Sequence, residues 1–212
     1  MAGVLFRWRP RQLLMRALPR RATDESQAAF WEREIFQAYG GDWGDFDRGT
    51  VTVPQLVQRI SHRTGLSVQE VLAVVEAVPQ ELQAIEASVA LVHQLADAGH
   101  RLHYLSNMPE PYAAHLLAHN DFFRRFDSGI FSCRVGFNKP ETGIFESACR
   151  RFAATPEELL FLDDVPTNAN AARDLGWHAV QFFDAAQALH ELRQMGWVGV
   201  VRAGPVVGSR VW

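Results

Sequence analysis

The sequence of 212 residues has no long apolar run, and none of its hydrophobic stretches approaches the roughly 18 residues that a membrane-spanning helix needs. It is also poor in cysteine. Cys133 and Cys149 are its two cysteines, and they have neither a CxxC spacing nor a histidine pattern typical of a metal site. We therefore expect reduced cysteines that serve packing, no membrane association, and a cytoplasmic protein.

The sequence also lacks an excess of positive charge, since its formal net charge is -3 at pH 7. Binding to nucleic acid depends on clustered positive charge, so this balance argues against a nucleic-acid partner. Hydrophobic residues make up 48% of the chain. At this length, that fraction allows a substantial core in one domain, or in one domain with an insertion.

Apolar periodicity divides the sequence into two parts. Between residues 10 and 80 the spacing is helical, with no convincing strand and with a turn at 45–50. The expected helices are 26–39, 53–64 and 67–78, the last of which ends before Pro79. From residue 82 onward helices and strands alternate. The expected helices are 82–98, 109–118, 142–153, 166–175 and 185–195, and the expected strands are 102–105, 130–133, 159–162 and 178–182. This alternation predicts an α/β fold with a doubly wound parallel sheet.

Two adjacent carboxylates, Asp163 and Asp164, stand between the strand 159–162 and the helix that follows Pro166. The carboxyl end of a parallel strand is where open α/β sheets bind their ligands. Two carboxylates placed there repel each other unless a cation joins them, and such oxygen ligands suit Mg²⁺. An Asx turn followed by a helix N-cap explains the pair equally well.

Two other predicted strand ends also carry polar groups. Ser106 and Asn107 offer a hydroxyl and a backbone amide, and Lys139 offers a cation. Taken singly, the first pair is more often a helix cap and the lysine a solvated loop residue. Together with a Mg²⁺ site, however, they are the groups that hold and neutralise a transferring phosphoryl group.

In this order the motifs resemble the haloacid dehalogenase-like (HAD) hydrolase superfamily, in the branch with a helical cap inserted after the first motif. The similar segments are Leu105-Ser106-Asn107 (second motif), Gly136-Phe-Asn-Lys139-Pro140 (third), Phe161-Leu-Asp163-Asp164 with Asn168 (fourth), and the shorter signatures Phe46-Asp-Arg-Gly49 and 171–176. The resemblance implies a Rossmannoid core of residues 1–9 and 81–196 with a helical cap of residues 10–80. Residues 197–212 form a tail without an assignment.

The resemblance also implies roles for the site residues. Ser106 and Asn107 would bind the phosphoryl oxygens, and Lys139 would steady their charge. Asp164 would bind Mg²⁺ directly with support from Asp163, and the backbone carbonyl of Ala2 could be a further ligand. The expected partner is a small phosphorylated metabolite, whereas the oligomeric state is open.

The first motif is where the sequence departs from the family. Only Gly3-Val4-Leu5 matches, and Val4 to Phe6 resembles a fragment of a strand. The nucleophilic aspartate of the family would fall one position before Met1, so we expect the natural chain to begin several residues upstream. Ala2 stands where family phosphatases carry a second aspartate, the general acid and base, whose loss slows departure of a poor leaving group by roughly 10² to 10⁴.

The first 22 residues contain no acidic residue and no serine, but they contain six arginines: Arg7, Arg9, Arg11, Arg16, Arg20 and Arg21. An Arg-rich, acid-free start resembles a mitochondrial transit peptide, although such peptides favour serine. We favour the alternative that this segment links the first motif to the cap and lies close to an anionic substrate.

Three functions are compatible with the sequence. The leading hypothesis is a Mg²⁺-dependent phosphoric monoester hydrolase that works through an aspartyl-phosphate, which residues 1–212 by themselves could not form. A 2-haloacid dehalogenase would use the same nucleophile without a metal, but the adjacent carboxylates argue against it. The third is an inactive protein that binds a phosphorylated ligand, or a partner through its cap.

Overall fold

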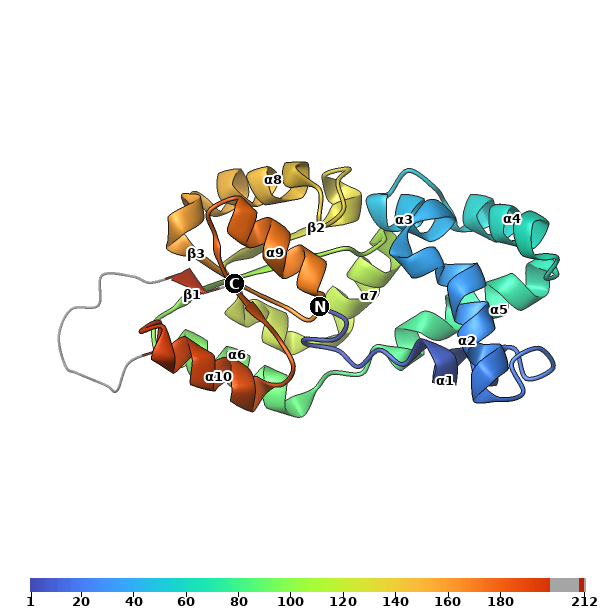
Figure 1. Ribbon diagram of the computed structural model, residues 1–212, viewed down its shortest axis with the longest axis horizontal. Coiled ribbons are helices and arrows are strands. Elements are labelled where there is room, and N and C mark those ends of the chain that lie inside the picture. The colour runs from blue at the N-terminus through green and yellow to red at the C-terminus, as the bar shows by residue number, and fades with distance from the viewer. Residues whose placement is uncertain (199–209, 212) are drawn as a thin grey trace.

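The computed structural model describes residues 1–198 and 210–211. Figure 1 shows an elongated molecule in which a sheet with its covering helices lies beside a separate group of helices. None of the helices in the described part of the chain is long and apolar enough to cross a membrane. Most of the unassigned tail, residues 199–209 and 212, lies outside the described residues.

Five strands form one parallel sheet in the order β2-β1-β5-β3-β4. The strands are β1 (Arg101–Ser106), β2 (Ser128–Phe131), β3 (Leu159–Asp163), β4 (His178–Gln181) and β5 (Arg210–Val211). Leu105 of β1 pairs with Ile130 of β2, and Phe161 of β3 pairs with Ala179 of β4. The first three residues of β3 are apolar and fully buried, as expected for a strand covered on both faces.

Helices cover both faces of this sheet (Figure 1). They are α6 (Glu86–Asp97), α7 (Glu110–His119), α8 (Thr142–Phe152), α9 (Pro166–Asp174) and α10 (Ala185–Gln194). Helices α8 and α9 bury Phe145 and Ala169 on one face, whereas α6 and α10 bury Leu95 and Leu192 on the other. The doubly wound α/β architecture predicted from the sequence is therefore confirmed.

A second group of helices comes from the first third of the chain, and we call it the cap. It contains α1 (Pro10–Ala17), α2 (Glu25–Phe36), α3 (Gly41–Arg48), α4 (Val53–Thr64) and α5 (Val68–Glu81), with a 3-10 turn at Gln37–Tyr39. Leu14, Ile35 and Leu56 are fully buried among these helices. The start of α5 is fixed by a capping box, in which Ser67 and Glu70 satisfy each other's backbone amides.

Helix α3 replaces the turn predicted at 45–50. Trp43 and Phe46 lie three residues apart and are both buried, and Gly49 ends the helix with a φ of +81°. A Cβ at Gly49 would lie 2.7 Å from the carbonyl oxygen of Cys133, so only glycine permits this close approach to the core. The helix has eight residues, two of them glycine, which is too little for a periodic pattern to show.

Helix α5 continues through Pro79 to Glu81, although the sequence predicted that it would stop before the proline. Proline removes the hydrogen bond to the carbonyl four residues earlier, which belongs to Val75. The hydroxyl of Tyr112 on α7 donates to that carbonyl oxygen at 2.9 Å. A side chain from the core thus supplies the donor that the helix lost, and the helix persists.

Other predicted boundaries shift by a few residues. Helix α6 begins at Glu86 rather than at 82, because the preceding residues bind the N-terminal segment: the amide of Ile85 donates to Leu5. Strand β2 spans 128–131 rather than 130–133, because Ser132 opens a 3-10 turn. The segment from Val4 to Phe6 is a loop with isolated bridges rather than part of a strand.

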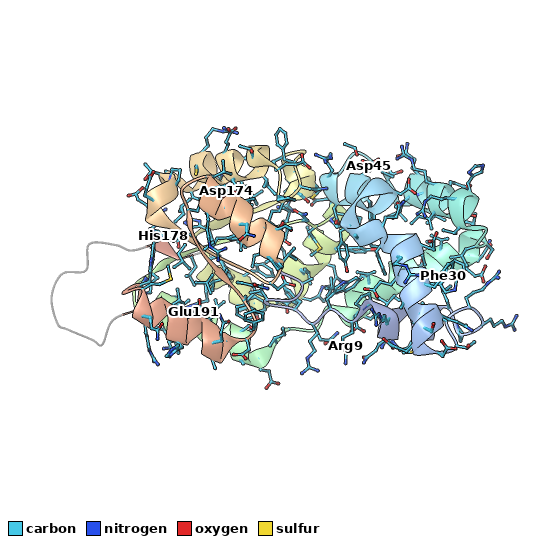
Figure 2. All side chains as sticks on the ribbon, viewed as in Figure 1. Arg9, Phe30, Asp45, Asp174, His178 and Glu191 are labelled. Carbon is cyan, nitrogen blue, oxygen red and sulfur yellow. The ribbon has the colours of Figure 1, made fainter. Side chains whose placement is uncertain are left out.

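The basic N-terminal segment is built into the cap. Arg9, labelled in Figure 2, and Arg16 both bind the buried carboxylate of Glu81. Arg11 binds two carboxylates of α2, and Arg21 binds one on α5. These arginines therefore hold the cap helices together, and none of the six lines the cavity described below. Trp8 of the same segment does line it, so the expectation that this segment lies close to an anionic substrate stays a prediction.

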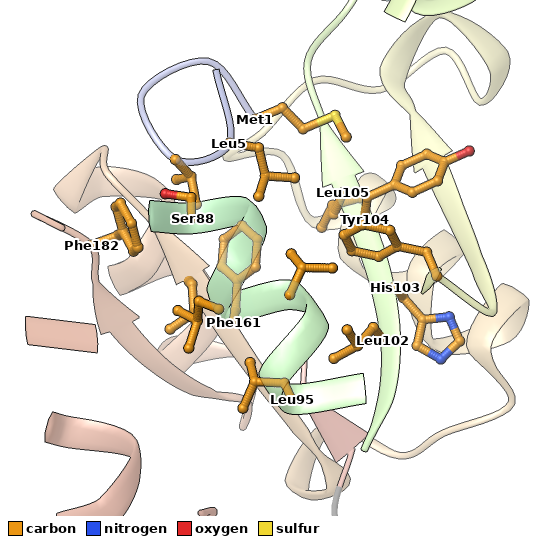
Figure 3. A pocket seen from close by; sticks show the side chains of 15 residues that line it. Met1, Leu5, Ser88, Leu95, Leu102, His103, Tyr104, Leu105, Phe161 and Phe182 are labelled. Atoms are coloured by element: carbon orange, nitrogen blue, oxygen red, sulfur yellow. The ribbon is translucent and has the colours of Figure 1, made fainter. Parts of the chain in front are cut away.

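A small apolar cavity of about 70 Å³ separates β1 from β3 (Figure 3). Strand β5 pairs only with the first residues of these strands, up to Leu102 and Leu160. Beyond that point Leu5, Leu105 and Phe161 line the space. Because its walls are mostly apolar, this cavity belongs to the core rather than to a polar site.

Candidate active site

A larger cavity of about 480 Å³ lies between the cap and the carboxyl ends of β1 and β3. The site residues predicted from the sequence all line it: Ala2, Ser106, Asn107, Lys139, Asp163 and Asp164. The topology explains this convergence, because the carboxyl ends of parallel strands meet at one edge of the sheet. The structure thus brings together groups that lie up to 162 positions apart in the chain.

Lys139 is buried and tied to the end of β3. Its Nζ donates to Asp163 Oδ2 at 2.5 Å and to the carbonyl oxygen of Leu105 at 3.3 Å. Burial acts to raise the pKa of Asp163, but the charge of Lys139 opposes it, and the pKa is lowered overall. A buried cation held in this way points to an anion site rather than to a solvated loop lysine.

Asp163 also organises the turn into α9. Its Oδ1 accepts hydrogen bonds from the amide of Val165 at 3.0 Å and from Asn168 Nδ2 at 2.9 Å. The Asx-turn interpretation is therefore correct for this residue, and it is compatible with a site. With both oxygens engaged, Asp163 positions Lys139 and α9 rather than offering a free ligand.

Asp164 is arranged differently, because its carboxylate lies against the N-terminal segment. A Cβ at Gly3, whose φ is +83°, would lie 2.1 Å from Asp164 Oδ2, so only glycine leaves room for this carboxylate. Burial raises the pKa of Asp164, and the charge of Asp163 adds to the rise. The Met1 amino group and Lys139 oppose this rise, so the carboxylate of Asp164 lies among charges of both signs.

The residues present fit a magnesium ion. The carboxylate of Asp164 lies close to the backbone of Gly3, and Ala2, the residue before it, lines the same cavity. In the described part of the chain no three His, Cys, Asp or Glu side chains converge on one point that could hold a metal ion. Mg²⁺ usually binds one or two carboxylates together with substrate phosphate and water, so Asp164 is a donor of the right kind.

Ser106 and Asn107 end strand β1 beside the lysine. Ser106 is buried, and its Oγ lies 3.2 Å from the carbonyl oxygen of Asn107. The Asn107 side chain donates to the backbone carbonyl of Lys139 at 3.0 Å and accepts from its amide at 2.7 Å. The Asn107 side chain therefore positions the backbone of Lys139. The group of Asn107 that could bind an anion is then its backbone amide.

The amino group of Met1 shares the electrostatic environment of this cavity. Burial lowers the pKa of this amino group to about 6, and the positive charge of Lys139 contributes to the decrease. Asp163 and Asp164 act in the opposite direction. The start of the described chain therefore lies among the charged groups of the site.

Helix α3 attaches the cap to the core at this cavity. Arg48 forms a bidentate ion pair with Glu141, in which Nη1 donates to Oε2 at 2.7 Å and Nη2 donates to Oε1 at 2.6 Å. Asn138 Nδ2 donates to the carbonyl oxygen of Gly44 at 2.8 Å, and Ser132 Oγ donates to that of Asp47 at 2.5 Å. The sequence analysis assigned no role to these groups, although it noted the Phe46–Gly49 signature that contains two of them.

The cap side of the cavity is largely aromatic. Trp8, Tyr39 and Trp43 line it together with Tyr112 from the core helix α7. Trp8 Nε1 donates to the Tyr39 hydroxyl at 2.5 Å, and burial raises the pKa of Tyr39 to about 12. Gln37, Ala38 and Tyr39 all have a positive φ, which is unusual for residues other than glycine. Sequence patterns do not predict this conformation.

Comparison with known proteins identifies the family. The family described as haloacid dehalogenase-like hydrolase matches residues 10–176. The chain belongs to this family. The resemblance inferred from the strand-end motifs is thereby confirmed, and so is the general assignment of this HAD-like protein as a hydrolase.

Similar proteins include the sesquiterpene phosphatase astK of Aspergillus oryzae, which is 23% identical over 198 residues, covering 92% of this chain and 93% of that protein. Bifunctional epoxide hydrolase 2 of Rattus norvegicus is 40% identical over 72 residues. That match covers 34% of this HAD-like chain and spans only 13% of the length of the rat protein.

Solved structures share the fold of this HAD-like hydrolase. A HAD family enzyme of Bacteroides thetaiotaomicron, determined as a magnesium complex, has a TM-score of 0.67 at 18% identity, covering 86% of this chain and 89% of that one. The L-2-haloacid dehalogenase of Xanthobacter autotrophicus has a TM-score of 0.61 at 17% identity, with coverages of 84% and 73%. At these identities the likeness shows the fold alone.

Proposed function

We propose that this HAD-like hydrolase is a Mg²⁺-dependent phosphoric monoester hydrolase. The observation that carries the proposal is the presence in one cavity of buried Lys139, held by Asp163, and of the carboxylate of Asp164. A phosphoryl group needs its oxygens neutralised as it is transferred, and a bound Mg²⁺ supplies part of that charge.

The chain's own residues would hold the phosphoryl group. The Ser106 hydroxyl and the Asn107 amide bind its oxygens, and Lys139 neutralises their charge while Asp163 keeps the lysine in place. The covalent route requires a carboxylate nucleophile in the same cavity. By the family resemblance this nucleophile belongs to the first motif, of which Gly3-Val4-Leu5 is the matching part, and the amino group of Met1 lies among these charges.

We propose further that the substrate is a small phosphate ester with an apolar body. The aromatic wall formed by Trp8, Tyr39 and Trp43 suits such a group, because it offers a large apolar contact area. Among the described residues that line the cavity, both cationic side chains are engaged, Arg48 by Glu141 and Lys139 by Asp163. The name of the fungal relative, a sesquiterpene phosphatase, agrees with this class.

Two other functions compete with this proposal. A 2-haloacid dehalogenase shares the fold, but the adjacent carboxylates Asp163 and Asp164 favour a bound metal, which that reaction does not need. An inactive protein that binds a phosphorylated ligand would need no general acid, which agrees with the alanine at position 2. The cytoplasm remains the location that we propose, which is compatible with the two free cysteines.

Turnover assays separate these functions. Phosphate release from 4-nitrophenyl phosphate is measured with and without EDTA, both for residues 1–212 and for a chain extended upstream through an aspartate immediately before Met1. Mg²⁺-dependent release by the extended chain alone is the expected result. Release by residues 1–212 would contradict the mechanism. Binding without turnover in the extended chain would favour the binding protein, and chloride release from chloroacetate in EDTA would favour the dehalogenase.

A further inference from the structure

The cap contributes a buried acid to the cavity that the proposed chemistry has not used. Asp47 on α3 is only 5% exposed, and it lines the cavity together with Ser106 and Lys139. Asp45, two residues earlier on the same helix (Figure 2), also lines the cavity, but its side chain is 46% exposed and binds Arg59. Among the described residues no group donates a hydrogen bond to the Asp47 carboxyl.

Three titratable groups on other elements face Asp47. Lys139, in the loop before α8, lowers the pKa of Asp47 through its positive charge. A negative charge on Asp47 would in turn raise the pKa of Tyr39 on the 3-10 turn and of Tyr112 on α7. The phenols are neutral at ordinary pH, and the lysine is already paired with Asp163. Burial therefore dominates and raises the pKa of Asp47 to about 8, against the opposing effect of Lys139.

A neutral carboxyl group is also the form that a phosphate site can accept. A carboxylate at this place would repel a bound phosphate ester, whereas a bound anion disfavours ionisation and keeps the proton on Asp47. The anchoring contacts of α3 fix its position: the Arg48–Glu141 ion pair, the bond from Asn138 to Gly44, and the bond from Ser132 to the Asp47 carbonyl. The acid is thus held at the wall of the cavity, within reach of the charge of Lys139.

We propose that Asp47 is the proton donor of this site and protonates the ester oxygen of a phosphate monoester as the leaving group departs. The inference rests on the proposed phosphatase function and assigns the acid that Ala2 cannot supply. It places the acid on the cap, so that proton transfer requires the cap and the core to be docked.

The oxygen of the carboxylate nucleophile bonds to phosphorus while the bond between phosphorus and the ester oxygen breaks. The ester oxygen takes the proton from Asp47 and leaves as a neutral alcohol, and Asp47 remains as a carboxylate. When water then attacks the acyl phosphate, Asp47 takes a proton from that water, inorganic phosphate leaves, and the carboxylate nucleophile is restored.

A binding experiment tests the assignment without depending on turnover. Orthophosphate is titrated into residues 1–212 with Mg²⁺ by calorimetry at pH 8, in buffers of different ionisation enthalpy, which counts the protons taken up. Because the bound anion favours the neutral carboxyl, binding near the pKa of about 8 should take up protons through Asp47. Asp47→Asn should abolish this uptake.

Asp42→Asn is the matched control, since Asp42 lies on the same helix but binds Arg63 and does not line the cavity. It should retain the uptake. Uptake that is unchanged by Asp47→Asn overturns the assignment of Asp47 and leaves the phosphatase proposal standing. Orthophosphate that binds none of the three proteins contradicts the phosphatase proposal itself, and the inference falls with it.

A kinetic comparison gives a second readout in the extended chain. Asp47→Asn should lower the ratio of the rate on an alkyl phosphate to the rate on 4-nitrophenyl phosphate by roughly 10² or more, because only the poor alkoxide leaving group needs the proton. Equal losses on both substrates would indicate a structural role and overturn the proposal.

Discussion

The buried acid of the cap should make the stability of the protein depend on pH, and Asp47→Asn should remove that dependence. The pKa of Asp47 in the folded state is about 8, whereas the ordinary value is 3.8. Below about pH 4 the carboxyl is neutral in both states. Between pH 4 and 8 only the unfolded state loses the proton, so stability falls as pH rises, by about 1.4 kcal/mol for each unit.

At pH 7 this effect lowers the free energy of unfolding of the wild type by on the order of 4 kcal/mol. Asp47→Asn has no carboxyl to ionise and should not show this loss. The assay is urea unfolding of both proteins at several pH values between 4 and 8. The free energy of unfolding of the variant, relative to the wild type, should increase steadily across this range. Asp42→Asn should follow the wild type. If Asp47→Asn also ran parallel to the wild type, the reasoning on the buried carboxyl would be refuted.

Three further changes test other parts of the structure. Ala38→Gly should raise the free energy of unfolding by about 1 kcal/mol in thermal denaturation, because Ala38 has a φ of +51°; a decrease would show that the left-handed turn is not strained. Glu81→Gln should lower the free energy of unfolding by about 2 kcal/mol in the same assay, because buried Glu81 binds two arginines. The control Glu25→Gln, at an exposed ion pair, should lower it by less than about 0.5 kcal/mol. Equal losses in the two variants would contradict this. Lys139→Met should leave Asp163 buried without its cation, cost about 3 to 5 kcal/mol, and abolish orthophosphate binding in calorimetry; retained binding would contradict its role.

The sequence allowed the core and its strand-end residues to be predicted because the signals there are local. An apolar run of strand length followed by polar residues marks the end of β3, and the Asx turn made by Asp163 is set by residues within five positions. Once the alternation of strands and helices indicates a parallel sheet, the carboxyl ends of the strands must lie at one edge.

The cap side of the cavity could not be predicted, because its structure depends on contacts between distant residues. Helix α5 continues past Pro79 because of a hydroxyl on Tyr112, which is 37 positions away from the carbonyl that it binds. Helix α3 docks through Arg48 and Glu141, which are 93 positions apart. The burial that changes the acidity of Asp47 follows from this docking, so no local pattern around Asp47 could indicate it.

The most direct test of the account is the binding of orthophosphate to residues 1–212, measured by calorimetry with Mg²⁺ and with EDTA, in the wild type and in Asp164→Asn. The account predicts binding that requires Mg²⁺ and that is weakened at least tenfold by Asp164→Asn, because this carboxylate is the proposed protein ligand of the ion. Equal affinity with Mg²⁺ and with EDTA, unaffected by Asp164→Asn, would contradict the central claim that this edge of the sheet is a magnesium-dependent phosphate site.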